Sequence, residues 1–176
     1  VGEEHIGWRY DPIFIDDKYT VKYHLEQFEG ISAALQGYTK NCVISFLDLY
    51  QKVKRNFPEV KMVSKEQRKY LGQRMTRIAT EHKMILRPCG EGTELAAFGA
   101  DCNGCMTQQI YENAIHMSLD MPKKQFLRKE CACYLGNDIG AYNSCPHMCK
   151  YCYANYDEKS VRLNRINHNP KSAFLI

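Results

Sequence analysis

The chain has 176 residues, of which 44% are apolar, which excludes a disordered protein and fits one ordinary domain with a continuous core. Its 24 basic and 20 acidic residues are interspersed, so the formal net charge of +4 is weak evidence about partners. The nine cysteines are too few for a disulfide-dense scaffold and no apolar run approaches the roughly 18 residues of a membrane span, so we expect a soluble, cytoplasmic protein with no membrane partner.

The first predicted unit is a strand followed by a helix. Residues 5–15, HIGWRYDPIFI, are rich in aromatic and β-branched residues, which favours a strand. A helix should begin at Val21, because Thr20 is a suitable N-cap and apolar residues then recur at helical spacing. Gly37 lies where a glycine commonly follows a helix.

Two more strands follow. Residues 41–50, NCVISFLDLY, are nearly all apolar in their first half, which is typical of a parallel strand buried on both faces. After a linker around Pro58, Ser64 and Gln67 have the spacing of a capping box at a helix start, and 83–89 is the third strand. One face of the helix between them carries Leu71, Met75, Ile78 and His82. Three such units predict an α/β fold with a parallel sheet that is part of a larger barrel-like sheet or has an open edge.

The second half of the chain differs in character. We divide the sequence into a βα portion at 1–90 and a Cys-rich metal-binding segment at 91–176 that packs on the same domain. Residues 106–115 predict a short helix, whereas 120–156 predict coil interrupted by cysteines.

Three cysteines fall within eight residues of CPHMCKYC. Cys145, Cys149 and Cys152 can converge on one metal centre, and cysteine rarely recurs at this density for packing alone. His147 could supply a fourth ligand to zinc. An iron-sulfur cluster held by only three thiolates would leave one iron open, as catalysis requires.

CPHMCKYC resembles the cluster motif of radical S-adenosylmethionine enzymes, in which an aromatic residue, here Tyr151, precedes the last cysteine. That resemblance implies a four-iron four-sulfur (4Fe-4S) cluster at Cys145, Cys149 and Cys152, with S-adenosylmethionine on the open iron and cleavage to a 5'-deoxyadenosyl radical. It also implies an electron donor such as a ferredoxin or flavodoxin, and an unknown substrate. Tyr151 and Asn143 are the candidate cofactor-binding residues.

Nearly the whole chain resembles one uncharacterised family, DUF1848, whose members carry such a cysteine cluster near the C-terminus. The resemblance rests on WRYDPIFI, CVISFLDLY, ECAC, NDIGAYNSCPHMCKYCYAN and HNPKSAFLI. Met148 stands where we expect a glycine in that family. The resemblance implies a partial TIM-like barrel. The chain begins with Val1 rather than Met. In addition, the resemblance implies an N-terminal portion of the same protein that supplies further strands.

Two charged residues on the first strand are candidate catalytic residues. Arg9 and Asp11 share one face and lie toward its C-terminal end, where parallel α/β sheets build their sites. They could hold a substrate or the methionyl group, or they could form a structural ion pair.

Four other cysteines predict a second metal site. Cys89 ends the third strand, Cys105 precedes the short helix, and Cys131 and Cys133 form a Cys-x-Cys pair. Four thiolates from three segments suit an auxiliary 4Fe-4S cluster, which we favour, or a structural zinc. Cys102 competes with Cys105 as the ligand, and Cys42 is expected to be a core thiol.

Two other functions remain open. The chain could be a non-catalytic zinc or iron-sulfur binding module. It could also be a nucleic-acid repair enzyme, since CKYCYAN is similar to the motif of spore photoproduct lyases.

Overall fold

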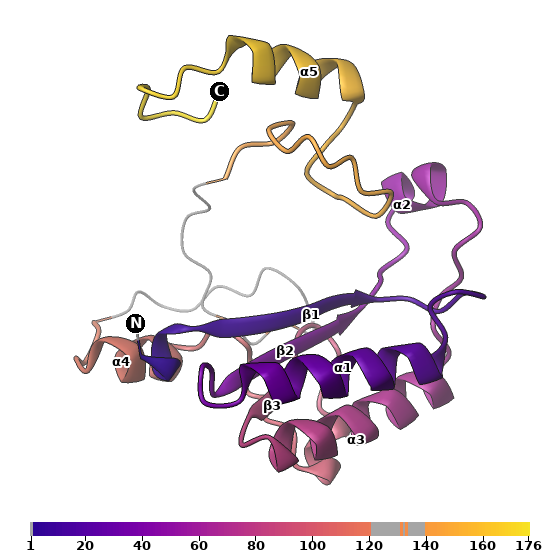
Figure 1. Cartoon of the computed structure of the whole chain (residues 1–176), viewed down its shortest axis with the longest axis vertical. Helices are drawn as coiled ribbons and strands as arrows, with labels where there is room; N and C mark the ends of the chain where they lie inside the picture. Colours follow the sequence, from indigo (N-terminus) through magenta and orange to yellow (C-terminus); the bar gives the residue numbers. More distant parts are fainter. Residues whose placement is uncertain (1, 121–130, 132, 134–139) are drawn as a thin grey trace. The chain divides into compact units, whose positions relative to one another are not determined.

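The computed structural model describes residues 2–120, 131, 133 and 140–176, and their fold is mixed α/β. The chain divides into two compact units (Figure 1). Unit 1 comprises Val1–Leu47 and Lys61–Leu135, and unit 2 comprises Asp48–Val60 and Gly136–Ile176.

Unit 1 contains a parallel sheet of three strands in the order β1-β2-β3. Its strands are β1 (Gly7–Ile13), β2 (Asn41–Phe46) and β3 (Ile85–Pro88). The register pairs Trp8 with Cys42 and Cys42 with Leu86, with an irregularity between Tyr10 and Ile13. All three predicted strands and their parallel arrangement are therefore confirmed. In the described residues the sheet is open and does not close into a barrel.

The two long helices of unit 1 begin where the sequence predicts. In α1 (Val21–Leu35), the Thr20 hydroxyl accepts a hydrogen bond from the Tyr23 amide at 3.1 Å. In α3 (Lys65–Glu81), Ser64 and Gln67 form a complete capping box. Gly37 follows α1 at φ 84°, a left-handed conformation that glycine adopts without steric cost.

Both helices cover the same face of the sheet (Figure 1). Successive side chains along a strand point to opposite faces of the sheet, which explains why the helices cover only one of the two faces. The covered face is apolar, and the core between it and the helices includes Ile13, Phe28, Cys42, Ile44, Phe46, Leu71, Met75 and Leu86. Trp8 also stacks on Phe28 at a centroid distance of 4.9 Å.

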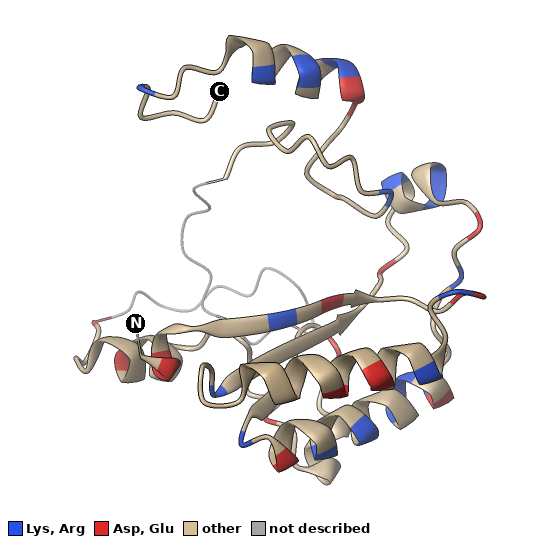
Figure 2. Cartoon of the chain, in the orientation of Figure 1, with Lys and Arg blue, Asp and Glu red and all other residues tan. Residues whose placement is uncertain are grey.

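The other set of strand side chains is polar. Arg9 and Asp11 are exposed on β1, Ser45 is half-buried on β2, and Arg87 is buried on β3. Figure 2 shows charged residues within β1 as well as along α1 and α3. One face of the sheet therefore forms the core, and the other carries polar groups.

The remaining elements are short. In unit 1 they are the 3-10 turns η1 (Glu3–His5) and η2 (Glu94–Phe98), and α4 (Gln108–Ile115), which confirms the short helix predicted there. In unit 2 they are α2 (Gln51–Asn56) and α5 (Glu158–Asn167). The sequence predicted a linker where α2 forms. Across the described ranges, no helix is both long and apolar enough to cross a membrane.

Candidate metal centres

Four cysteines of unit 1 lie together beside the polar face of the sheet. Cys89 directly follows β3, and its amide donates to the Ile44 carbonyl at 2.9 Å, which fixes its backbone against β2. Cys105, Cys131 and Cys133 are buried, with exposures of 6%, 4% and 5%, and cluster with Val43. Cys89 packs against this cluster. We call these four residues the tetrad.

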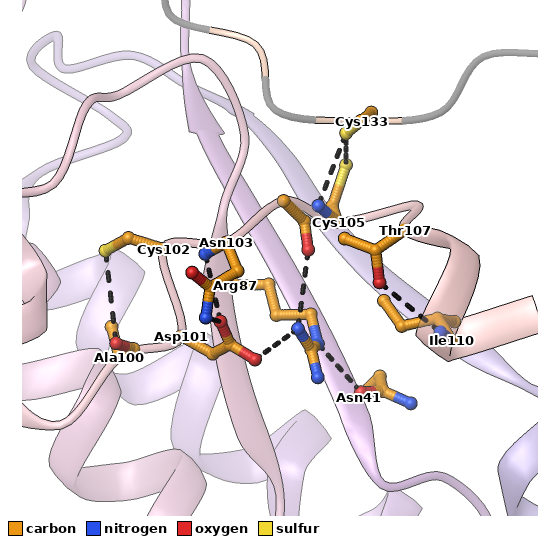
Figure 3. A network of polar contacts seen from close by, with 11 residues as sticks. Asn41, Arg87, Ala100, Asp101, Cys102, Asn103, Cys105, Thr107, Ile110 and Cys133 are labelled. Carbon is orange, nitrogen blue, oxygen red and sulfur yellow. Dashed lines mark hydrogen bonds and ion pairs between the residues drawn. The ribbon is translucent and has the colours of Figure 1, made fainter. Parts of the chain in front are cut away.

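Direct contacts join three members of the tetrad. The Sγ atoms of Cys105 and Cys133 are 3.2 Å apart, and the Cys105 amide donates to the Cys133 sulfur at 3.3 Å (Figure 3). Cys89 packs against the cluster that contains Cys105 and Cys133. Cys102, the competing residue, instead packs against the apolar core and contacts the Ala100 carbonyl at 3.9 Å. The structure thus brings Cys105, and not Cys102, to the tetrad.

The loop that carries Cys105 is anchored by Arg87. The Arg87 guanidinium binds Asp101 at 2.5 Å, the Gly104 carbonyl at 3.3 Å and the Asn41 side chain at 3.0 Å (Figure 3). In addition, the Asp101 amide donates to the Leu86 carbonyl at 2.9 Å. These bonds hold both ends of the turn before Cys105 against strands β2 and β3.

Arg9 connects the tetrad to Asp11. Its Nε and Nη2 atoms both donate to Asp11 Oδ2, at 3.1 and 2.6 Å, and Nη1 lies 3.8 Å from the Cys105 sulfur. Ser45 donates to the same Asp11 oxygen at 3.3 Å. The predicted pair is present as an ion pair, and its cation lies beside thiols that would carry negative charge as metal ligands.

The thiols of unit 1 differ in their electrostatics. Hydrogen bonds from Cys105 and Cys133, aided by Arg9, lower the pKa of Cys89, so the group favours a thiolate there. Contact with Cys105 and Cys89 raises the pKa of Cys133, because a second negative charge beside the first is unfavourable. Burial raises the pKa of Cys42 to about 12. Cys42 lies on the apolar face, as expected for a core thiol.

The triplet Cys145, Cys149 and Cys152 lies in a loop of unit 2. Cys145 and Cys149 are exposed and Cys152 is half-buried. The Cys152 amide donates to the Cys149 carbonyl at 2.9 Å, which closes a tight turn. Met148 has φ 51°, a left-handed conformation that is unfavourable for residues other than glycine.

Asn155 supports the triplet loop from within. It is 5% exposed, and its Nδ2 donates to the Cys145 carbonyl at 2.7 Å and approaches Met148 Sδ at 3.8 Å. Its Oδ1 is buried with no hydrogen-bond partner in the described part of the chain. The sequence analysis did not identify Asn155, although this residue ends the segment NDIGAYNSCPHMCKYCYAN.

Asn143 and Tyr151, the predicted cofactor-binding residues, belong to the same unit. Asn143 Oδ1 accepts from the Tyr156 amide at 2.5 Å, and its amide donates to the Ala154 carbonyl at 3.1 Å. Asn143 therefore ties the start of the loop to its end. Tyr151 lies between Lys150 and Cys152 in the sequence, and the residue is half-buried.

The 48–60 segment packs on the triplet loop inside unit 2. Lys150 pairs with Glu59 at 2.6 Å and lies over the Phe57 ring. Lys52 lies over the Tyr156 ring, which stacks on Tyr142 at 5.2 Å. Two segments distant in sequence thus form the support of the triplet.

Neither cysteine group is a finished metal site. The nine cysteines, all within the described residues, are free thiols. No group of three or more His, Cys, Asp or Glu side chains among those residues is already arranged to hold a metal ion. The donor types nevertheless suit soft metals, because thiolates select zinc and iron-sulfur clusters.

Comparison with known proteins identifies a family but no characterised relative. Residues 1–154 match the family model described as a domain of unknown function, DUF1848. This range includes all nine cysteines. No curated protein and no solved structure matches the chain.

Proposed function

The chain belongs to the DUF1848 family, and from this premise we propose that it is a radical S-adenosylmethionine-type enzyme of unknown substrate. The catalytic 4Fe-4S cluster would be held by Cys145, Cys149 and Cys152. The observation that carries the proposal is the Cys-x-x-x-Cys-x-x-Cys loop, which offers three thiols and lies partly open to solvent.

The residues of the loop fit such a group. Three thiolates from one short segment leave one iron without a protein ligand, whereas a structural site is closed by four. When bound, the cluster and S-adenosylmethionine together supply a 5'-deoxyadenosyl radical for hydrogen abstraction. The protein's part would be to orient the thiols, and we assign this role to Asn155, which donates to the Cys145 carbonyl.

Other residues have proposed roles in the reaction. Tyr151 and Asn143 would shape the cofactor pocket, although the Asn143 side chain already binds the Tyr156 amide. Arg9 and Asp11, on the polar face of a sheet proposed to belong to a partial TIM-like barrel, are proposed as catalytic residues of unit 1. We place the protein in the cytoplasm, where a ferredoxin or flavodoxin could reduce the cluster.

The decisive experiment uses the anaerobically reconstituted, reduced protein. We expect an electron paramagnetic resonance signal that changes when S-adenosylmethionine is added, together with formation of 5'-deoxyadenosine. An unchanged signal would mean that no iron is open to the cofactor. Zinc at the triplet, without iron or sulfide, would replace the enzyme by a metal-binding module.

A further inference from the structure

We propose that the tetrad, Cys89, Cys105, Cys131 and Cys133, binds a single zinc ion that joins Cys131 and Cys133 to the sheet. This site is separate from the triplet and does not depend on the function proposed above. Its ligand is a divalent cation with a preference for four sulfur donors.

The donor set is the first reason. Four thiols from three segments gather in one buried cluster, and four thiolates make a closed structural zinc site. A buried cysteine does not require other cysteines beside it, and Cys42 on the other face of the same sheet is an example.

The spacing of the sulfurs favours one ion over the auxiliary 4Fe-4S cluster that the sequence alone favoured. Tetrahedral zinc with Zn–S bonds of about 2.3 Å holds its sulfurs roughly 3.8 Å apart. The Cys105 and Cys133 sulfurs are 3.2 Å apart, close to that spacing, and Cys131 and Cys89 pack in the same cluster. A 4Fe-4S cluster needs a much wider cage, because the four irons and four sulfides lie between the thiolates.

The surroundings already position the ligands. Arg87 fixes the turn before Cys105, and the backbone bond to Ile44 fixes Cys89. Such outer contacts orient metal ligands and raise affinity. Arg9, at 3.8 Å from the Cys105 sulfur, offsets part of the negative charge that four thiolates leave around a divalent ion.

Binding changes protonation but not oxidation state. Zinc replaces the thiol protons, which pass to solvent, and the sulfurs stay reduced. The ion then joins Cys131 and Cys133 to Cys89, which follows β3, and to Cys105, which precedes α4.

The first test measures zinc in the whole chain purified under reducing conditions. We expect about one zinc ion per chain, and at least a tenfold lower content in Cys105→Ala and Cys133→Ala. Cys102→Ala is the matched control, because Cys102 lies three residues away and contacts Ala100 instead. It should keep its zinc, as should Cys149→Ala, which separates this site from the triplet.

The second test needs no variant, so a misfolded mutant does not affect it. Alkylation followed by mass spectrometry should find all four tetrad thiols protected in the zinc-loaded chain and modified after a chelator removes the metal. Reactivity unchanged by the chelator, a Cys105–Cys133 disulfide in the purified chain, or iron and sulfide lost specifically from Cys105→Ala would each overturn the zinc site. Zinc that disappears from Cys149→Ala and persists in Cys105→Ala would overturn it as well.

Discussion

The two cysteine groups differ in almost every physical property. The tetrad comes from three separated segments of unit 1 and is largely buried against Val43, with Arg9 beside it. The triplet comes from eight consecutive residues of unit 2, and two of its three thiols are exposed. A closed, buried set of four suits a structural ion, whereas an open set of three suits a metal that must meet a small molecule. This contrast supports the two proposals, in which the tetrad serves stability and the triplet serves the chemistry.

Removing one triplet thiol should have the largest effect. In Cys149→Ala, two thiolates remain, which are too few to hold a cluster with one open iron. We expect 5'-deoxyadenosine formation to fall below detection, while zinc content and thermal unfolding stay close to those of the unaltered chain. Product is measured by chromatography after anaerobic reconstitution.

The matched control for that variant is Cys102→Ala, which should form product normally. Undiminished product from Cys149→Ala would remove the triplet from catalysis and would end the division of roles between the two groups.

The support of the tetrad should be sensitive to Arg87. Arg87→Met leaves Asp101 without its cation and releases the turn before Cys105. Breaking a fully buried pair costs about 3–5 kcal/mol, and because the Asp101 side chain keeps 27% exposure we expect about 2–3 kcal/mol of lost unfolding free energy. Urea unfolding followed by Trp8 fluorescence measures it.

Arg77→Met provides the comparison for Arg87. Arg77 pairs with Glu81 on the exposed side of α3, where the two side chains are 70% and 52% exposed. Surface pairs of this kind contribute about 0.5 kcal/mol or less. Equal losses in the two variants would show that Arg87 does not anchor the loop.

Local signals in the sequence predicted much of unit 1. The cap at Thr20 and the capping box at Ser64 act within a few residues, so the sequence contains all the information they need. Alternation on β1 likewise predicted that Arg9 and Asp11 share a face. Helix α2 was missed because it is short and lies between segments that resemble a strand and a linker.

The support of the two cysteine groups could not be predicted in the same way. Arg87 reaches Asp101 and Gly104 across the sheet edge, and no spacing rule connects these positions. The role of Asn155 could not be predicted either, because its contact with Cys145 depends on how the loop folds back. Sequence patterns named the candidate ligands, whereas the side chains that hold them depend on tertiary contacts.

A third kind of thiol sharpens the contrast, since Cys42 is fully buried and no other thiol contacts it among the described residues. Burial raises its pKa to about 12 from the ordinary 9.0, so the folded protein keeps a proton that the unfolded chain loses. Stability should therefore be fully present below about pH 9 and decline as pH rises toward 12, by about 2 kcal/mol near pH 10.5. Urea unfolding from pH 8 to 10.5 measures the decline.

Two variants isolate the contribution of Cys42. Cys42→Ala should reduce the alkaline decline. Val43→Ala truncates the neighbouring residue without removing a titrating group, so it should lower stability at every pH and keep the slope. If both variants decline as steeply as the unaltered chain, burial of Cys42 is not the cause.

The smallest expected effect concerns the backbone of the triplet loop. Met148 has φ 51°, and a left-handed conformation costs a residue with a side chain about 1–2 kcal/mol relative to glycine. Met148→Gly removes that cost but gives the unfolded chain more freedom, which leaves a net gain of about 0.5–1 kcal/mol. The Cys152 amide, which donates to the Cys149 carbonyl across this turn, should exchange its hydrogen about 2–5 times more slowly.

His147→Gly is the control, because His147 is the exposed preceding residue and is not among the residues with positive φ. Glycine at this position should only loosen the loop and speed exchange. Faster exchange in both variants would mean that Met148 is not strained, and that the loop's order comes from Asn155 and the 48–60 segment alone.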